Sequence, residues 1–240
     1  MKYRILLGLF ILLPLFGCLK NKETISNTTP SALYFEAQNF IQSRNWLGAI
    51  KKLETLDTHY PFSPYSKQMQ LDLIYAYYKN NDSALTLATI ERFVKLNPSH
   101  EKMDKILYIR GLTNMARDSN LIHNFFDVNR NDRDPEPAKS ALHDFDQLLK
   151  HYPNSPYVLQ SQKYISTLRN RLAEHDLAVA RFYLKRHAWI AAINRAQKVQ
   201  REYPNFKIAS QSLKIQLQAY KELGLKELVE RTEKLLEQKI

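Results

Sequence analysis

The sequence predicts an all-α fold of about ten helices. From Ser31 onward the chain has only three glycines, and its prolines fall between segments in which apolar residues recur at helical spacing. No stretch alternates polar and apolar residues for long, so we expect no β-sheet. A third observation is an internal repeat, because several residues of the N-terminal third recur 143 positions later (37 to 180, for example).

The internal repeat combines small, aromatic and proline positions. Its two copies share Ala37 and Ala180, Trp46 and Trp189, Ala49-Ile50 and Ala192-Ile193, and Tyr60-Pro61 and Tyr203-Pro204. Small residues let two helices approach closely, and proline ends a helix because it cannot donate the backbone hydrogen bond. This pattern over two short helices is typical of tetratricopeptide repeats. The predicted fold is therefore an α-solenoid of about five tetratricopeptide-like helix pairs, which form one cooperative domain because a single pair cannot bury its apolar face alone.

The turn residues divide residues 31–240 into ten expected helices. These are 31–43, 46–59, 64–79, 82–96, 100–117, 135–151, 156–185, 188–202, 207–222 and 225–238. The seventh is long, about 45 Å, and we expect it to join N-terminal repeats (31–117) to C-terminal repeats (135–240). An insertion, 118–134, separates the two groups, and Asp134 and Pro135 at its end are residues typical of a helix start.

The N-terminus predicts export and lipidation. Lys2 and Arg4 precede an apolar run that is too short to span a bilayer and ends at Cys18, the only cysteine of the chain. Residues 15–18 resemble a bacterial lipobox, so we expect a signal peptide at 1–17, a lipidated Cys18 and a flexible tether to residue 30. Leu19 stands where an aspartate would favour the inner membrane, which predicts the outer membrane, facing the periplasm. The alternative is an ordinary signal peptide with an incidental cysteine.

Composition and motifs argue against several functions. The net charge of +11 is spread among acidic residues, which favours solvated helix faces over a nucleic-acid surface. The sequence has no glycine-rich phosphate loop, no paired-histidine metal helix and no nucleophile beside a recognisable base. We also expect no carboxylate in a setting that raises its pKa. The sequence therefore predicts a protein that is not an enzyme and uses no cofactor or metal.

The chain resembles the BamD family, lipoprotein subunits of the β-barrel assembly machine. The resemblance is carried by Trp46, Tyr60-Pro61-Phe62, Arg110-Gly111-Leu112-Thr113-Asn114, Asp132-Arg133-Asp134-Pro135 and Asn194-Arg195. The insertion is its specific part, because generic repeats lack it. The resemblance implies N-terminal repeats that recognise unfolded outer-membrane proteins and C-terminal repeats that dock the barrel-forming subunit, BamA. It also admits other Bam lipoproteins as partners.

Two sets of residues are candidates for these roles. The predicted substrate-binding residues are Tyr60, Phe62, Tyr65, Tyr75 and Tyr78, with core packing as the alternative. The predicted partner interface comprises Phe125, Phe126, Arg133, Asn194 and Arg195. Arg195 lies about 200° round its helix from Ile193 and is expected to point away from the core; the alternative is a merely solvated arginine.

Two other functions fit a periplasmic repeat protein. Residues 152–157, Tyr-Pro-Asn-Ser-Pro-Tyr, also occur in repeat proteins that coordinate cell division with peptidoglycan synthesis. Those proteins usually carry a coiled coil, and no heptads follow Ser31. A helical superstructure attached to a murein-cleaving enzyme is the third alternative, but the chain leaves no room for a catalytic domain.

Overall fold

The structure is a computed structural model that describes residues 28–119, 134–204, 206 and 208–238. These residues form ten α-helices and no strand. The helices are α1 (Pro30–Gln42), α2 (Trp46–His59), α3 (Ser66–Lys79), α4 (Ser83–Leu96), α5 (Met103–Ser119), α6 (Glu136–His151), α7 (Val158–Lys185), α8 (Trp189–Glu202), α9 (Ile208–Glu222) and α10 (Lys226–Glu237). All ten expected helices are confirmed, with ends that differ by at most three residues.

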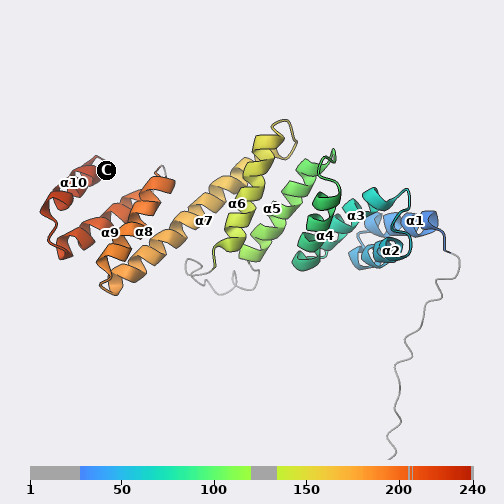
Figure 1. Cartoon of the computed structure of the whole chain (residues 1–240), viewed down its shortest axis with the longest axis horizontal. Coiled ribbons are helices and arrows are strands. Elements are labelled where there is room, and N and C mark those ends of the chain that lie inside the picture. Colours follow the sequence, from blue (N-terminus) through green and yellow to red (C-terminus); the bar gives the residue numbers. More distant parts are fainter. Residues whose placement is uncertain (1–27, 120–133, 205, 207, 239–240) are drawn as a thin grey trace, which may run out of the picture.

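The helices follow one another along a single long axis, from α1 at one end to α10 at the other (Figure 1). Each helix packs on its neighbours in sequence, which is the arrangement of a solenoid. The long helix α7 has 28 residues, about 42 Å, and crosses the stack obliquely between α6 and α8. The prediction of an all-α solenoid is confirmed.

Four helix ends share one backbone conformation. Tyr60, Asn97, Tyr152 and Tyr203 follow α2, α4, α6 and α8, with φ between −136° and −132° and ψ between 48° and 58°. A proline follows each of them and disfavours helix in the residue before it. The chain therefore leaves four helix pairs in the same direction, which keeps the stack regular.

The turns inside the pairs also share a conformation. Arg44, Asn81 and His187 adopt φ of 58°, 60° and 57°, and Gly224 adopts 70°. This left-handed region is costly for residues that carry a Cβ, and glycine and asparagine tolerate it best. The third pair differs because the insertion separates α5 from α6.

Small residues allow the helices to approach closely, as the repeat predicted. Ala37, Ala49, Ala180 and Ala192 are completely buried. Gly111 of α5 has the same role, because a Cβ at this position would lie only 2.7 Å from the buried ring of Phe145 on α6.

The hydrophobic core is continuous along the stack. Its buried clusters join α1 to α3, α3 to α5, α5 to α9 and α7 to α10, so each cluster shares helices with the next. The two ends lack a neighbour within the described chain. There, Phe35 of α1 and Leu228 and Leu235 of α10 remain 66%, 37% and 40% exposed. None of the described helices is long and apolar enough to cross a membrane.

Candidate functional site

The first three predicted substrate-binding residues surround the turn between α2 and α3. Phe62 is 97% exposed, more than any other large apolar side chain of the described residues. Tyr65 stacks on Tyr34 of α1, with ring centroids 4.8 Å apart. Tyr60 is half-buried, and its hydroxyl donates to the backbone oxygen of Thr28 at 3.0 Å. Phe62 is therefore presented to solvent, whereas Tyr60 and Tyr65 take part in packing.

The Tyr65 contact recurs in the third helix pair. Tyr157 stacks on Tyr108 of α5 with ring centroids 4.5 Å apart, and Tyr65 and Tyr157 have the same backbone angles, φ −87° and ψ −8°. Both tyrosines end a Tyr-Pro-x-Ser-Pro-Tyr segment, at 60–65 and 152–157. Comparing these two segments in the sequence would have shown that Tyr65 belongs to the scaffold.

A polar network crosses the neighbouring surface of α1, α3 and the residue before α5. Asp72 accepts hydrogen bonds from the Tyr34 hydroxyl at 2.9 Å, from Gln38 at 2.7 Å and from Gln68 at 2.9 Å. Gln68 in turn accepts from Lys102, the residue before α5, at 3.2 Å. Burial, then the Asp72 carboxylate, raises the pKa of Tyr34, so its hydroxyl stays a donor. No motif in the sequence indicated this network.

The remaining two candidates lie at the other end of α3. The ring of Tyr75 meets Trp46 edge-on at 5.7 Å, and the Nζ atoms of Lys79 and Lys105 lie 5.8 Å and 5.3 Å from its centroid. Tyr78 is half-buried, and burial followed by nearby Tyr164 raises its pKa. Tyr65 and Tyr75 are ten residues apart, about 15 Å along the helix. The structure thus divides the five predicted residues into two separate groups.

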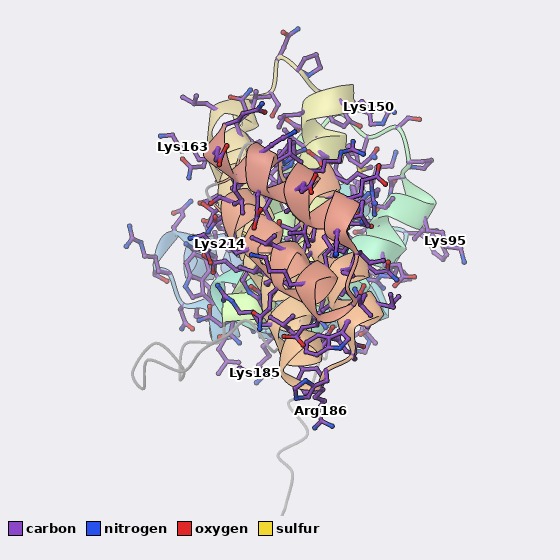
Figure 2. All side chains as sticks on the ribbon, turned by 90° about the vertical axis from the view of Figure 1, so that its left-hand side faces the viewer. Lys95, Lys150, Lys163, Lys185, Arg186 and Lys214 are labelled. Atoms are coloured by element: carbon purple, nitrogen blue, oxygen red, sulfur yellow. The ribbon has the colours of Figure 1, made fainter. Side chains whose placement is uncertain are left out.

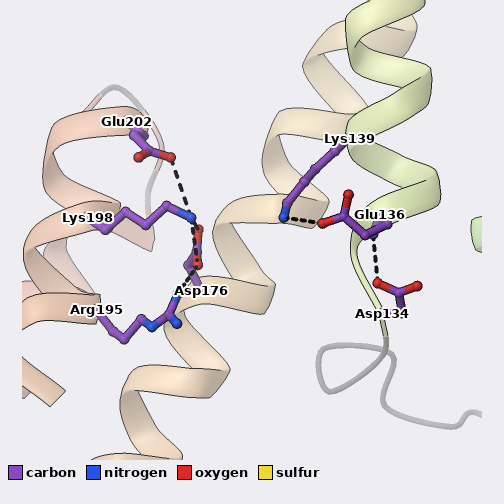
Figure 3. A network of polar contacts seen from close by, with 7 residues as sticks. All are labelled: Asp134, Glu136, Lys139, Asp176, Arg195, Lys198 and Glu202. Atoms are coloured by element: carbon purple, nitrogen blue, oxygen red, sulfur yellow. Dashed lines mark hydrogen bonds and ion pairs between the residues drawn. The ribbon is translucent and has the colours of Figure 1, made fainter. Parts of the chain in front are cut away.

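The C-terminal candidates Asn194 and Arg195 are both exposed on α8. Figure 3 shows that Arg195 and Lys198 of α8 reach toward Asp176 of α7. Lys198 Nζ lies 2.8 Å from Oδ2 of Asp176, and Arg195 Nη1 lies 3.7 Å from Oδ1. The Asp176 side chain is 5% exposed and that of Arg195 is 44% exposed.

Arg195 is exposed, as expected for a residue outside the core, but it does not point directly away from the core. The expected direction was measured from Ile193 alone, whereas α8 is buried on two sides. Ile193 packs with α9, whereas Ala192 and Val199 pack in the cluster shared with α7. Arg195 is only about 60° from Ala192 and about 40° from Val199 round the helix. It therefore lies along the edge of the α7–α8 contact.

A second buried carboxylate joins α5 to α6. Asp144 is 3% exposed, and Arg110 donates to its Oδ1 from Nη2 at 2.6 Å and from Nε at 2.7 Å. Asn114 donates to Oδ2 at 3.1 Å. These residues line an open cleft of about 600 Å³ between α4, α5 and α6. Burial raises the pKa of Asp144, although Arg110 opposes the shift. The expectation that no carboxylate has a raised pKa was therefore wrong, because the sequence does not show burial.

The polar groups form no cluster of metal ligands in the described residues. No three His, Cys, Asp or Glu side chains gather there as metal ligands would. His59 and His151 are exposed, and His151 shares a hydrogen bond with Gln147 at 2.9 Å.

Basic side chains point outward on several sides of the solenoid. Figure 2, viewed along the long axis, places Lys95, Lys150, Lys163, Lys185, Arg186 and Lys214 around its circumference. These labelled cations do not gather on one face, which agrees with the expected dispersed charge.

Comparison with known proteins identifies the family. The model of the family described as YfiO, outer membrane lipoprotein, matches residues 26–235. Outer membrane protein assembly factor BamD of Vibrio cholerae serotype O1 is 58% identical over 237 residues, 99% of this chain and 98% of that protein. The chain belongs to the BamD family. BamD of Neisseria meningitidis serogroup A is 37% identical, covering 91% of this chain and 82% of that protein. BamD of Haemophilus influenzae is 31% identical, covering 92% and 84%.

Family membership agrees with the resemblance seen in the sequence and associates the chain with the outer membrane. The relatives' names do not support a division or murein-cleaving role. Several predicted BamD-type features lie outside the described residues: Cys18, the signal peptide, and Phe125, Phe126 and Arg133 of the insertion.

The Arg110–Asp144 pair of this BamD-family chain yields a prediction about stability. Arg110→Met removes the cation and leaves a buried carboxylate, so we expect the free energy of unfolding to fall by about 3 kcal/mol. Asp144→Asn removes the charge instead and should cost only about 1 kcal/mol. Denaturant unfolding of the mature protein measures both.

The pH dependence of Arg110→Met provides the control. Because the pKa of Asp144 is raised in the folded state, the folded protein binds a proton that the unfolded chain binds only at lower pH. Loss of Arg110 raises this pKa further, so Arg110→Met should regain stability relative to wild type as the pH falls from 7 to 5. Equal losses in the two variants, or no recovery in acid, would contradict a buried charge as the cause.

Proposed function

We propose that this chain is an outer membrane protein assembly factor that acts as a helical scaffold and not as an enzyme. It binds segments of unfolded outer-membrane β-barrel proteins and docks the barrel-forming subunit, BamA. The observation that carries the proposal is 58% identity over nearly the whole chain to a protein named outer membrane protein assembly factor BamD. A solenoid suits a scaffold because it exposes extended surface for its length.

We further propose that Cys18 is lipidated after removal of residues 1–17 and anchors the chain to the outer membrane, facing the periplasm. The family description as outer membrane lipoprotein supports this, together with the single cysteine after the apolar run. Residues 19–30 then tether the solenoid, with BamA and further Bam lipoproteins as partners at the same membrane.

Replacement of the cysteine tests the anchor. Cys18→Ala should move the protein from the membrane fraction to the soluble fraction, since no described helix could hold it in a bilayer. Fractionation with palmitate labelling measures this, and Cys18→Ser serves as a second variant. Continued labelling of both variants would rule out lipidation at this position.

The substrate surface is proposed to centre on Phe62, flanked by Tyr60 and Tyr65. Exposed aromatic rings bind the apolar and aromatic residues of barrel strands with little loss of entropy. Tyr75 and Tyr78 offer a second aromatic position farther along α3, so an extended segment could contact both groups.

Photocrosslinking at position 62 tests this surface. A photoreactive residue there should capture a synthetic peptide with the C-terminal sequence of an outer-membrane barrel protein. Leu159 of α7 is the matched control, because it is also apolar and is 68% exposed. Comparable capture at position 159 would indicate non-specific binding to exposed apolar side chains and would count against a site at Phe62.

The docking surface is proposed to lie on α8 at Asn194 and Arg195, with Phe125, Phe126 and Arg133 of the insertion contributing. A half-exposed arginine beside an apolar helix contact can meet a partner's carboxylate through two hydrogen bonds.

Charge reversal tests the docking surface. Arg195→Glu should reduce co-purification of BamA about tenfold, because the new carboxylate repels the one that the arginine binds. Lys95→Glu on α4 is the control for general basicity, since Lys95 is exposed and outside this surface. Equal loss in both variants would mean that BamA recognises overall charge and not Arg195.

A further inference from the structure

Asp176 is a buried carboxylate that already has a complete counterion. Lys198 Nζ lies 3.1 Å from Oδ1 and 2.8 Å from Oδ2, so the ammonium bridges both oxygens. A buried carboxylate needs such a partner, because desolvation otherwise disfavours its charge. The positive charge of Arg195 is therefore not required to neutralise Asp176.

Arg195 lies close enough to Asp176 to be attracted but too far to be hydrogen-bonded. Its Nη1 is 3.7 Å from Oδ1 of Asp176, beyond hydrogen-bond distance. The guanidinium forms no hydrogen bond to any other residue in the described part of the chain. Its five N–H donors thus remain available, while Asp176 attracts the group toward the α7–α8 edge.

The spacing on α8 fixes this arrangement. Arg195, Lys198 and Glu202 are three and four residues apart, so they share one face of the helix, and Figure 3 shows them in a row beside α7. Glu202 Oε2 lies 3.7 Å from Lys198 Nζ and adds a weaker pull on the ammonium. Lys198 lies between the carboxylates of Asp176 and Glu202. Arg195 is next to Lys198 on the same face of α8, and its side chain is partly exposed to solvent.

We propose that Asp176, with Lys198 as its counterion, is a positioning residue that holds the Arg195 guanidinium ready for a carboxylate of the docked subunit. The proposal rests on the docking role of Arg195. An arginine on a solvated helix samples many rotamers, and ordering it in advance reduces the entropy that binding must remove. Asp176, which lies on α7, restrains the Arg195 guanidinium of α8 without forming hydrogen bonds to its N–H groups.

A double-mutant cycle tests the proposal with the full mature protein and detergent-solubilised BamA. We compare wild type, Asp176→Asn, Arg195→Met and the double variant by measuring Kd. Asp176→Asn keeps the side-chain volume and an oxygen for Lys198. It should weaken binding about tenfold when Arg195 is present and less than about twofold in the Arg195→Met background, because residues in one network couple.

Lys198→Met is the second variant, in case Asp176→Asn does not fold. Without Lys198, Arg195 becomes the only counterion of Asp176 and is drawn into a direct pair, so binding should again weaken about tenfold. Asp146→Asn is the matched control, because Asp146 pairs with Arg169 at the same 3.7 Å between α6 and α7. It should leave Kd unchanged.

The outcomes separate this inference from the docking role. If Arg195→Met loses binding while Asp176→Asn binds like wild type, docking stands and the positioning role of Asp176 is wrong. An equal loss on Asp176→Asn in both backgrounds would make Asp176 a structural residue only. If Arg195→Met itself binds like wild type, the docking role fails, and the positioning role fails with it.

Discussion

Each helix pair of this solenoid depends on its neighbours, because neither of its two helices can bury its apolar face within the pair. The buried clusters therefore run across pair boundaries and share helices, from α1 to α10. This dependence requires close approach, which Ala37, Ala49, Ala180, Ala192 and Gly111 allow. The apolar side chains that stay exposed at α1 and α10 lie where this mutual covering stops in the described chain.

The fold was predictable because its rules are local. A proline follows the ends of α2, α4, α6 and α8, and the same φ and ψ recur in the residue before each of these four prolines. Helix spacing and buried small residues then follow from a pattern that appears twice in the sequence. The expected start of α6 was confirmed only in part: Asp134 Oδ1 accepts from the backbone N–H of Glu136 at 3.0 Å, but the N-cap position is Pro135, which provides no side-chain capping hydrogen bond. The helix begins one residue later than the position of Pro135 suggested.

The candidate sites were less predictable because they depend on contacts between helices. The five aromatic candidates are close in sequence, yet a rigid helix separates Tyr65 from Tyr75 by about 15 Å. The direction of Arg195 required knowledge that α8 is buried on two sides, which one reference residue cannot reveal. Of the five, Phe62 is exposed, because an aromatic residue in the turn between α2 and α3 has no helix face on which to be buried. Its role in substrate binding stays a prediction.

The two buried carboxylates, Asp144 and Asp176, are both paired with basic side chains, but they differ in which side chain is the close partner. Asp144 takes two short hydrogen bonds from Arg110, so two of the arginine's five donors are used inside the fold. Asp176 takes its hydrogen bonds from Lys198 instead, and Arg195 remains at 3.7 Å with its donors free. A compact ammonium can satisfy a carboxylate without the planar fork that favours recognition of a second carboxylate. The close partner of the carboxylate therefore makes the difference. With arginine as close partner, the pair holds two helices together; with lysine as close partner, a neighbouring arginine stays available at the surface.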